Sequence, residues 1–352
     1  MNKIKLYLTI YFSYFAVFAQ QTAQYTQFMY EKNFYNPGYI GISSNSVEGA
    51  ISVKSYLYDF TPDVTQESKS KVLDGLNKPT LVNLAFHGAS KKRNMAIGGR
   101  LEVDKQPIIN YTYLTFYASK RKKIGFNKLL SLGLEIGVKN ININFNNLKL
   151  ISNNDQAFQT DNSAPFNFFQ PNIGLGIYFK APKYYFGISE KNLAAFHFKW
   201  NENFTNKISA LNYPQTFICA GYKIGLGNSF FLQPNILYKL NTNNIFYQNK
   251  LKSNQRDNGL TKFLYNDLSI LDLNLTLGYK DIVALGGTFR TNNTIASIVR
   301  FNIVEKIYIS YAYDFPFGNS LKNNFKGNHE LLLNYIVDFG TYTDKTIDPR
   351  YY

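Results

Sequence analysis

Three histidines and one cysteine are the side chains of this sequence best suited to metal binding or nucleophilic catalysis. His87, His197 and His329 stand far apart and show no metal-ligand spacing. Cys219 lies in the run TFICAGYK, which contains no obvious base to activate its thiol. We therefore expect no metal, no cofactor and no enzymatic activity. A hydrolase built on scattered Ser, His and Asp residues stays a weaker alternative.

Glycine spacing and basic charge identify no ligand either. Gly174 and Gly176 lie inside an alternating run, whereas a phosphate-binding loop needs a strand–turn–helix context. The chain has 352 residues and a formal charge of +15. Its Lys and Arg residues form no basic helical face, so we expect no nucleic-acid partner.

Alternation of apolar and polar residues indicates the elements that must position any functional side chain. In residues 271–279, LDLNLTLGY, leucine takes every second position. This period of two excludes an amphipathic helix and predicts a strand whose two faces meet different surroundings. The pattern predicts about fourteen strands, near residues 47–58, 79–90, 93–104, 107–119, 127–140, 168–180, 183–192, 213–225, 228–240, 267–280, 282–291, 294–304, 306–315 and 327–340.

The connections between these strands alternate in length. Connections after even-numbered strands are short, whereas every long one follows an odd-numbered strand. Outer-membrane barrels have short periplasmic turns and long extracellular loops, and a sheet in lipid must close to pair its backbone groups. We predict an all-β fold, a closed antiparallel transmembrane β-barrel; a secreted two-sheet sandwich is the alternative. The long connections are residues 59–78, 141–167, 193–212 and 241–266.

The first residues have the form of a secretory signal peptide. Lys3 and Lys5 precede an apolar run, and cleavage after Ala19 would leave Gln20 as the first mature residue. The run is short for a membrane span, so an uncleaved anchor is the weaker alternative. We divide the chain into a signal peptide (1–19), an N-terminal periplasmic, plug-like segment (20–46), the barrel (47–340) and a C-terminal tail (341–352). Both termini should lie on the periplasmic side.

Two separated stretches resemble a known family. Residues 24–41 read QYTQFMYEKNFYNPGYIG, and residues 309–335 read ISYAYDFPFGNSLKNNFKGNHELLLNY. Together they are similar to the PorP/SprF family of the Bacteroidetes type IX secretion system, although Thr26 and Asn328 stand where that family has serine. The motif residues are Asn36, Pro37, Tyr311, Tyr313, Asp314, Gly327, His329 and Glu330.

The resemblance implies a non-enzymatic barrel in the outer membrane of a Gram-negative, Bacteroidetes-like bacterium. Relatives serve the export or surface attachment of adhesins with a type-B C-terminal secretion signal, including in gliding motility. The implied partners are outer-membrane lipid, the C-terminal domain of a secreted cargo protein, and periplasmic or outer-membrane components of the secretion system. An outer-membrane porin or substrate-specific transporter is the alternative function.

Charges of both signs fall on the predicted inward face of the strands. Mixed signs favour an interior crossed by ion pairs, because a selective channel would carry one sign. Asn36-Pro37-Gly38 marks a turn in a segment that we expect to enter the barrel as a partial plug. The lumen charges include Arg100, Glu102, Glu135, Asp272, Arg290 and Arg300.

Two motif residues near the C-terminus allow alternative interpretations. For Glu330 we favour an ion pair with an interior arginine such as Arg300 over a contact with a partner or with the N-terminal segment. Tyr311 and Tyr313 should face lipid as part of an aromatic belt.

Two further groups are candidates for contacts outside the barrel. A predicted short turn carries a basic run that could attract anionic lipid, which we favour, or dock an acidic periplasmic partner. The long loops carry aromatic side chains that could bind cargo at the outer mouth or pack over the lumen. The basic run is Lys120, Arg121, Lys122 and Lys123, and the cargo-binding candidates are Phe198, Trp200, Phe204, Phe246 and Tyr247.

Overall fold

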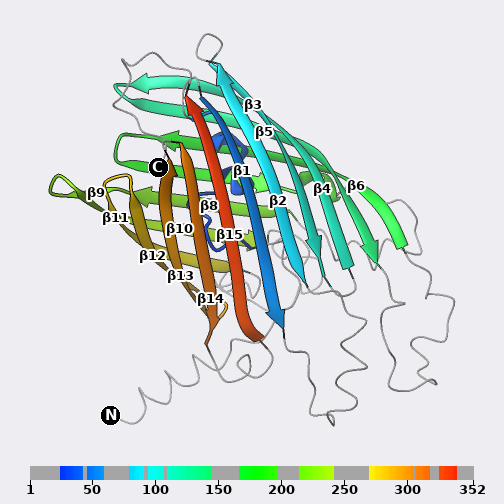
Figure 1. The fold of residues 1–352 in the computed structure, drawn as a ribbon. Helices are drawn as coiled ribbons and strands as arrows, with labels where there is room; N and C mark the ends of the chain where they lie inside the picture. The colour runs from blue at the N-terminus through cyan, green and yellow to red at the C-terminus, as the bar shows by residue number, and fades with distance from the viewer. Residues whose placement is uncertain are drawn as a thin grey trace, which may run out of the picture.

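The alternating segments form strands in the computed structural model of the chain (Figure 1). The structure describes residues 24–42, 46–58, 79–90, 94–106, 109–143, 166–196, 214–241, 269–304, 306–317 and 325–338. Its strands are β1 (Ser46–Tyr58), β2 (Thr80–Ser90), β3 (Met95–Lys105), β4 (Ile109–Gly125), β5 (Lys128–Ile143), β6 (Phe166–Lys180), β7 (Tyr184–Lys191), β8 (Gln215–Tyr222), β9 (Ile224–Leu226), β10 (Phe230–Asn241), β11 (Ile270–Tyr279), β12 (Val283–Arg290), β13 (Thr294–Val304), β14 (Ile307–Pro316) and β15 (Phe325–Asp338).

The sheet closes on itself. Strands next to each other in the chain pair antiparallel, β1 also pairs with β15, and the β10–β11 pairing completes the ring. β8 and β9 both pair with β10 and are separated only by Lys223. Together they occupy the place of one strand, so the barrel has 14 strand positions. Closure pairs the strand edges that a lipid environment would leave unsatisfied. The predicted closed antiparallel barrel is confirmed.

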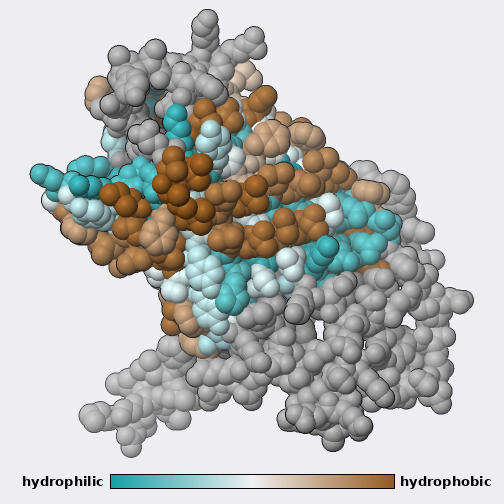
Figure 2. Space-filling model, viewed as in Figure 1, coloured by the Kyte–Doolittle hydropathy of each residue, from teal (hydrophilic) through white to brown (hydrophobic). Residues whose placement is uncertain are grey.

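The two faces of the strands point as the sequence predicts. In β11, Leu273 and Leu275 point outward and are 43% and 51% exposed, whereas Asp272 and Asn274 point inward and are 4% exposed. Figure 2 shows rows of apolar side chains, in brown, across the strands of the viewed face. An apolar outer surface around a polar interior is the arrangement of an outer-membrane barrel.

The antiparallel order sorts the connections onto two rims. We call the end that carries the connections after β2, β4, β6, β9, β11 and β13 the short-turn rim, and the opposite end the long-connection rim. All four long connections predicted from the sequence belong to the second rim. The sorting by parity is therefore confirmed, and by the usual polarity of such barrels the short-turn rim faces the periplasm.

β4 is longer than the sequence predicts. The alternation of apolar residues ends at Ala118, but cross-strand pairs with β5 continue through Lys123, opposite Leu129, to Gly125. The chain then reverses at Asn127, which has a φ of 55°. The predicted turn at residues 120–126 is wrong because a strand that leaves the apolar layer needs no apolar alternation to stay paired.

Helical structure is minor in the described chain. α2 (Lys32–Tyr35) and the 3₁₀ turn η1 (Pro37–Tyr39) lie in the N-terminal segment, and η2 (Leu193–Phe196) follows β7. Among the described residues no helix is long and apolar enough to cross a membrane.

Candidate functional site

The described part of the N-terminal segment, residues 24–42, lies inside the barrel, and we call it the plug. Every residue from Tyr25 to Ile42 is buried except Tyr30, which is partly buried. Its groups bond to inward-facing side chains of the wall on both sides of the ring. The prediction that this segment enters the barrel is confirmed, whereas the signal peptide and the C-terminal tail lie outside the described residues and stay predictions.

The plug runs from the long-connection rim to the short-turn rim. Gln24 accepts a 3.4 Å hydrogen bond from Asn292, which lies between β12 and β13 at the long-connection rim. At the other end, Ser119 donates to the carbonyl of Ile40 at 3.0 Å, close to the short-turn rim. The described beginning of this segment therefore lies at the long-connection rim, and its end lies at the short-turn rim. An even number of strands predicts the side on which β1 begins, but it does not predict the path of the chain before β1.

An ion cluster holds the outer end of the plug. The ammonium of Lys54 lies 2.9 Å from the Asp314 carboxylate and 3.3 Å from that of Glu330. The backbone amides of Thr26 and Gln27 donate to Glu330 at 2.8 and 3.0 Å. The Thr26 hydroxyl donates to Asp314 at 2.6 Å. We call Lys54, Asp314 and Glu330 the outer latch, because their charges bind the backbone and side chains of the plug.

The outer latch corrects the favoured interpretation of Glu330. Its ion-pair partner is Lys54, which stands directly opposite it in the β1–β15 register. Arg300 instead donates to Asn334 at 2.9 Å, and its guanidinium lies 4.1 Å from the ring centre of Tyr30. The contact between Glu330 and the N-terminal segment, the interpretation we ranked lower, is confirmed. Removal of one member of such a buried cluster typically costs about 3–5 kcal/mol, because the remaining charge is left uncompensated.

The other predicted lumen charges also face inward and are buried. Arg290 binds Asp272 through two hydrogen bonds of 2.7 and 3.1 Å. Its guanidinium also donates to the carbonyl of Tyr25 at 3.3 Å. The hydroxyl of Tyr25 donates to Glu102 at 2.8 Å, and Arg100 lies 3.7 Å from the same carboxylate.

Glu135 joins this network on the opposite wall. Its carboxylate lies 3.3 Å from Lys191, which also donates to the carbonyl of Phe34 in the plug at 2.7 Å. Asn172 donates to Glu135 at 2.6 Å. The predicted interior crossed by ion pairs is confirmed, and the plug takes part in the pairs.

The motif Asn36-Pro37-Gly38 rests on two glycines of the wall. The side chain of Asn36 accepts a 2.8 Å hydrogen bond from the Gly38 amide and so caps η1. Gly133 and Gly176 face each other across β5 and β6. A Cβ at Gly133 would lie 2.2 Å from the carbonyl carbon of Pro37, and one at Gly176 would lie 2.2 Å from the Asn36 side chain. Only glycine at these positions lets the turn approach the wall so closely.

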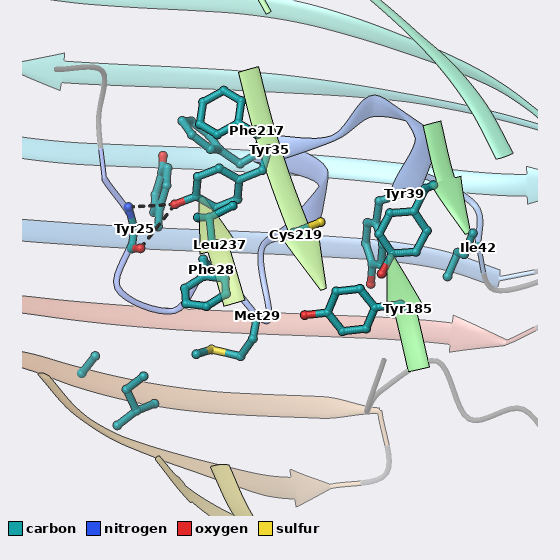
Figure 3. Close-up of a cluster of buried hydrophobic side chains, with 14 of the residues drawn as sticks. Tyr25, Phe28, Met29, Tyr35, Tyr39, Ile42, Tyr185, Phe217, Cys219 and Leu237 are labelled. Atoms are coloured by element: carbon teal, nitrogen blue, oxygen red, sulfur yellow. Dashed lines mark hydrogen bonds between the residues drawn. The ribbon is translucent and has the colours of Figure 1, made fainter. Parts of the chain in front are cut away.

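Aromatic packing fixes the middle of the plug. Tyr35 packs edge-on against Phe217 with ring centres 5.4 Å apart, and Tyr39 packs in the same way against Tyr178 at 5.5 Å. Figure 3 shows Tyr35 beside Phe217, and Tyr39 beside Tyr185, within this cluster. Burial of each such side chain contributes roughly 1.5–3 kcal/mol. Cys219 is buried in this cluster, where its thiol helps to fill the core.

The C-terminal motif has a second, outward-facing half. The Tyr311 hydroxyl and the His329 Nδ1 lie 2.6 Å apart on the outer surface, and the ring of Tyr313 lies 4.8 Å from that of His329. The expectation that both tyrosines face outward is confirmed. Gly327 has a φ of 117°, and a Cβ there would lie 2.7 Å from the Tyr313 hydroxyl. Glycine therefore permits this contact.

The basic run of β4 divides between the two faces. Arg121 stays at the short-turn rim, but it points inward and is buried, and its guanidinium donates to the carbonyl of Gly41. Lys120, Lys122 and Lys123 are exposed. The cargo-binding candidates Phe198, Trp200, Phe204, Phe246 and Tyr247 lie outside the described residues.

The residues first considered for chemistry serve packing where the structure describes them. His87 lies 3.4 Å from Glu48 and packs edge-on against Tyr39. Within the described ranges, no group of three His, Cys, Asp or Glu side chains could hold a metal ion. Sequence reasoning missed the plug residues Thr26 and Gln27, although both lie within the N-terminal motif.

The N-terminal and C-terminal motifs therefore meet at the outer latch. The sequence profile described as "Type IX secretion system membrane protein PorP/SprF" matches residues 17–335. The chain belongs to the PorP/SprF family. In this PorP/SprF protein, Thr26 and Gln27 of the first motif bind Asp314 and Glu330 of the second.

Two solved structures of transporters are similar to this PorP/SprF protein, and the first of them supports its barrel fold. The toluene transporter TbuX of Ralstonia pickettii is 9% identical with a TM-score of 0.50, over 89% of this chain and 93% of that one. The toluene transporter TodX of P. putida is 7% identical with a TM-score of 0.48, over 91% and 95% of the two chains. No curated protein matches the sequence significantly. The chain is thus a type IX secretion membrane protein with an outer-membrane barrel fold.

The direction in which the plug runs predicts where its beginning is accessible. In a Gln24→Cys variant, a membrane-impermeant maleimide should label intact cells, because residue 24 lies partly exposed at the long-connection rim. The native Cys219 is buried and should stay unlabelled. A Lys128→Cys control at the short-turn rim should react only after the outer membrane is permeabilised. If the Gln24→Cys variant also requires permeabilisation, the assigned direction is wrong.

Proposed function

We propose that this barrel is a non-enzymatic accessory or cell-surface anchor for particular cargo of the type IX secretion system. The cargo would be adhesin-like proteins that carry a type-B C-terminal signal. The observation that carries the proposal is that the two motifs which resemble the family bind the protein's own N-terminal segment inside the lumen. A barrel whose interior is filled in this way offers its rims and loops to partners.

The contacts of the plug support an interior that is normally closed. Its outer end is held by buried charges, its middle by aromatic packing, and its inner end by Ser119 and Arg121. A solute path along the barrel axis would have to break many of these contacts at once. The charged side chains around the plug carry both signs, whereas the lining of a selective pore carries one sign.

Cargo recognition is best placed at the long-connection rim. Four long connections gather there, and loops of such length usually carry function. The sequence places aromatic residues in two of them, and aromatic anchors surrounded by polar residues are typical of binding patches. We propose that Phe198 and Trp200 contact the C-terminal domain of the cargo, with Phe204, Phe246 and Tyr247 as further candidates.

Electrical conductance separates this proposal from the porin alternative. Wild-type protein in a planar bilayer should pass little steady current, because the plug fills the lumen. A Gly133→Val variant should pass more current, since its side chain occupies the position of the Pro37 backbone. A Gly49→Val control, at a position with open space beside the Cα, should behave as wild type. Large steady currents through wild type would favour a porin.

Cargo release tests the anchor function directly. Changing Phe198 and Trp200 together to Ala should release cargo from the cell surface into the medium, because the proposed apolar anchors are removed. Heat-modifiability on gels, which reports a folded barrel, should stay unchanged. A matched double variant, Tyr222→Ala with Phe230→Ala, removes two exposed aromatic residues at the opposite rim and should keep cargo on the surface. Wild-type levels of attached cargo on a normally folded double variant would exclude this loop as the anchor.

A further inference from the structure

The β4–β5 hairpin projects beyond β3 at the short-turn rim. β3 begins at Met95, opposite Lys120, and β6 ends at Lys180, opposite Leu129. Beyond Leu129 and its cross-strand partner Lys123, β4 and β5 continue without either neighbouring strand to the turn at Phe126. We call residues 122–128 the hairpin tip. No strand in the described chain pairs with the β3-facing edge of β4 beyond Lys120.

The hairpin tip combines basic and apolar side chains. Lys122, Lys123 and Lys128 are exposed, and the sequence has no carboxylate between residues 120 and 128. Phe126 is 90% exposed and Ile124 is 47% exposed. An aromatic side chain that is almost wholly exposed at the end of a hairpin forms no part of the folded core. It is therefore available for contact with lipid or with a partner.

The depth of these residues argues against lipid. The regular outward alternation of apolar residues ends at Ala118 on β4, where Lys120 and Lys122 follow before Ile124, and at Leu130 on β5. With a rise of ~3.3 Å per residue and a tilt of about 40°, Phe126 lies roughly 10 Å beyond Leu130 and roughly 20 Å beyond Ala118 along the membrane normal. The headgroup layer of one leaflet is only about 5–7 Å thick. Phe126 therefore lies beyond the headgroups, in the aqueous periplasm.

The order of lysines and aromatic residues along the hairpin also argues against insertion of Phe126 into lipid. A segment that inserts into a membrane surface buries its aromatic residues deeper than its lysines. In the hairpin the order is reversed, because Lys120 and Lys122 lie nearer to the membrane than Phe126. Anionic headgroups can attract these lysines, but they do not provide an apolar contact for Phe126.

We propose that the hairpin tip docks a periplasmic protein that presents an acidic surface around an apolar recess. Phe126 fills the recess, and Lys122, Lys123 and Lys128 meet the carboxylates around it. A central aromatic anchor within a charged rim is the usual composition of a protein interface, and opposite charge accelerates the encounter. The inference deepens the proposed function, on which it rests, by naming the surface that the secretion machinery would contact on the periplasmic side.

The first test asks whether lipid surrounds the tip. Trp200 is the only tryptophan of the chain, so a Phe126→Trp variant in a Trp200→Phe background carries a single reporter. In vesicles of phosphatidylcholine and phosphatidylglycerol with brominated acyl chains, its fluorescence should match that in unbrominated vesicles. A Phe116→Trp control, at an outward position of the apolar band that is 59% exposed, should be strongly quenched. Quenching of both variants to the same extent would overturn the proposal in favour of lipid.

The second test asks whether a protein covers the tip. A photocrosslinking amino acid at position 126 of the full-length protein, in native cells, should give one discrete adduct whose partner has an acidic contact surface. Combined Lys122→Glu and Lys123→Glu should abolish it. Combined Lys183→Glu and Lys280→Glu, an equal charge change among exposed residues of the same rim, should leave it intact. No adduct, an adduct with a second copy of this chain, or an adduct that survives reversal at the tip would overturn the proposal.

The two proposals fail in different ways. If the Phe198 and Trp200 double variant keeps its cargo while the tip adduct forms and depends on charge, docking at the tip stands and the loop anchor fails. If cargo is released but no adduct forms, the loop anchor stands and docking at the tip fails.

Discussion

Backbone hydrogen bonding in an apolar solvent is the constraint on which this structure depends. Hydrocarbon offers no partners to peptide groups, so a sheet that crosses it must pair its last strand with its first. β1 and β15 meet this requirement along their whole length. Once the ring closes, alternation along each strand divides the residues into an outward apolar set and an inward polar set. The leucines of β11 and the aspartate and asparagine between them are on opposite sides for this reason alone.

Closure creates a second requirement, which is to fill the interior. A ring of eight strands can be filled by its own side chains, whereas much larger rings keep a channel. With fourteen strand positions, this barrel lies between these limits, and its own N-terminal segment fills the interior. The inward polar set then becomes useful, because a chain inside the barrel needs donors and acceptors for its backbone. Glu330 accepts from two plug amides, and Lys191 donates to a plug carbonyl. Low dielectric makes these bonds strong and makes their loss costly.

Local pattern was enough to predict the strands, their faces and the sorting of connections, because each depends on a period of two and on loop length. It failed where non-local geometry decides. The partner of Glu330 depends on the register between β1 and β15, which places Lys54 opposite it. The path of the plug depends on contacts that no strand count constrains. β4 extends beyond its alternation of apolar and polar residues because its last residues lie outside the apolar layer.

The division of the outer latch among strands has a consequence for closure of the barrel. Lys54 belongs to β1, whereas Asp314 and Glu330 belong to β14 and β15. The cluster is complete only when β1 pairs with β15, because Lys54 then lies beside both carboxylates. The same carboxylates bind Thr26 and Gln27. The strand pairing that closes the barrel therefore also neutralises the charges that hold its N-terminal segment, so seam and plug are thermodynamically coupled.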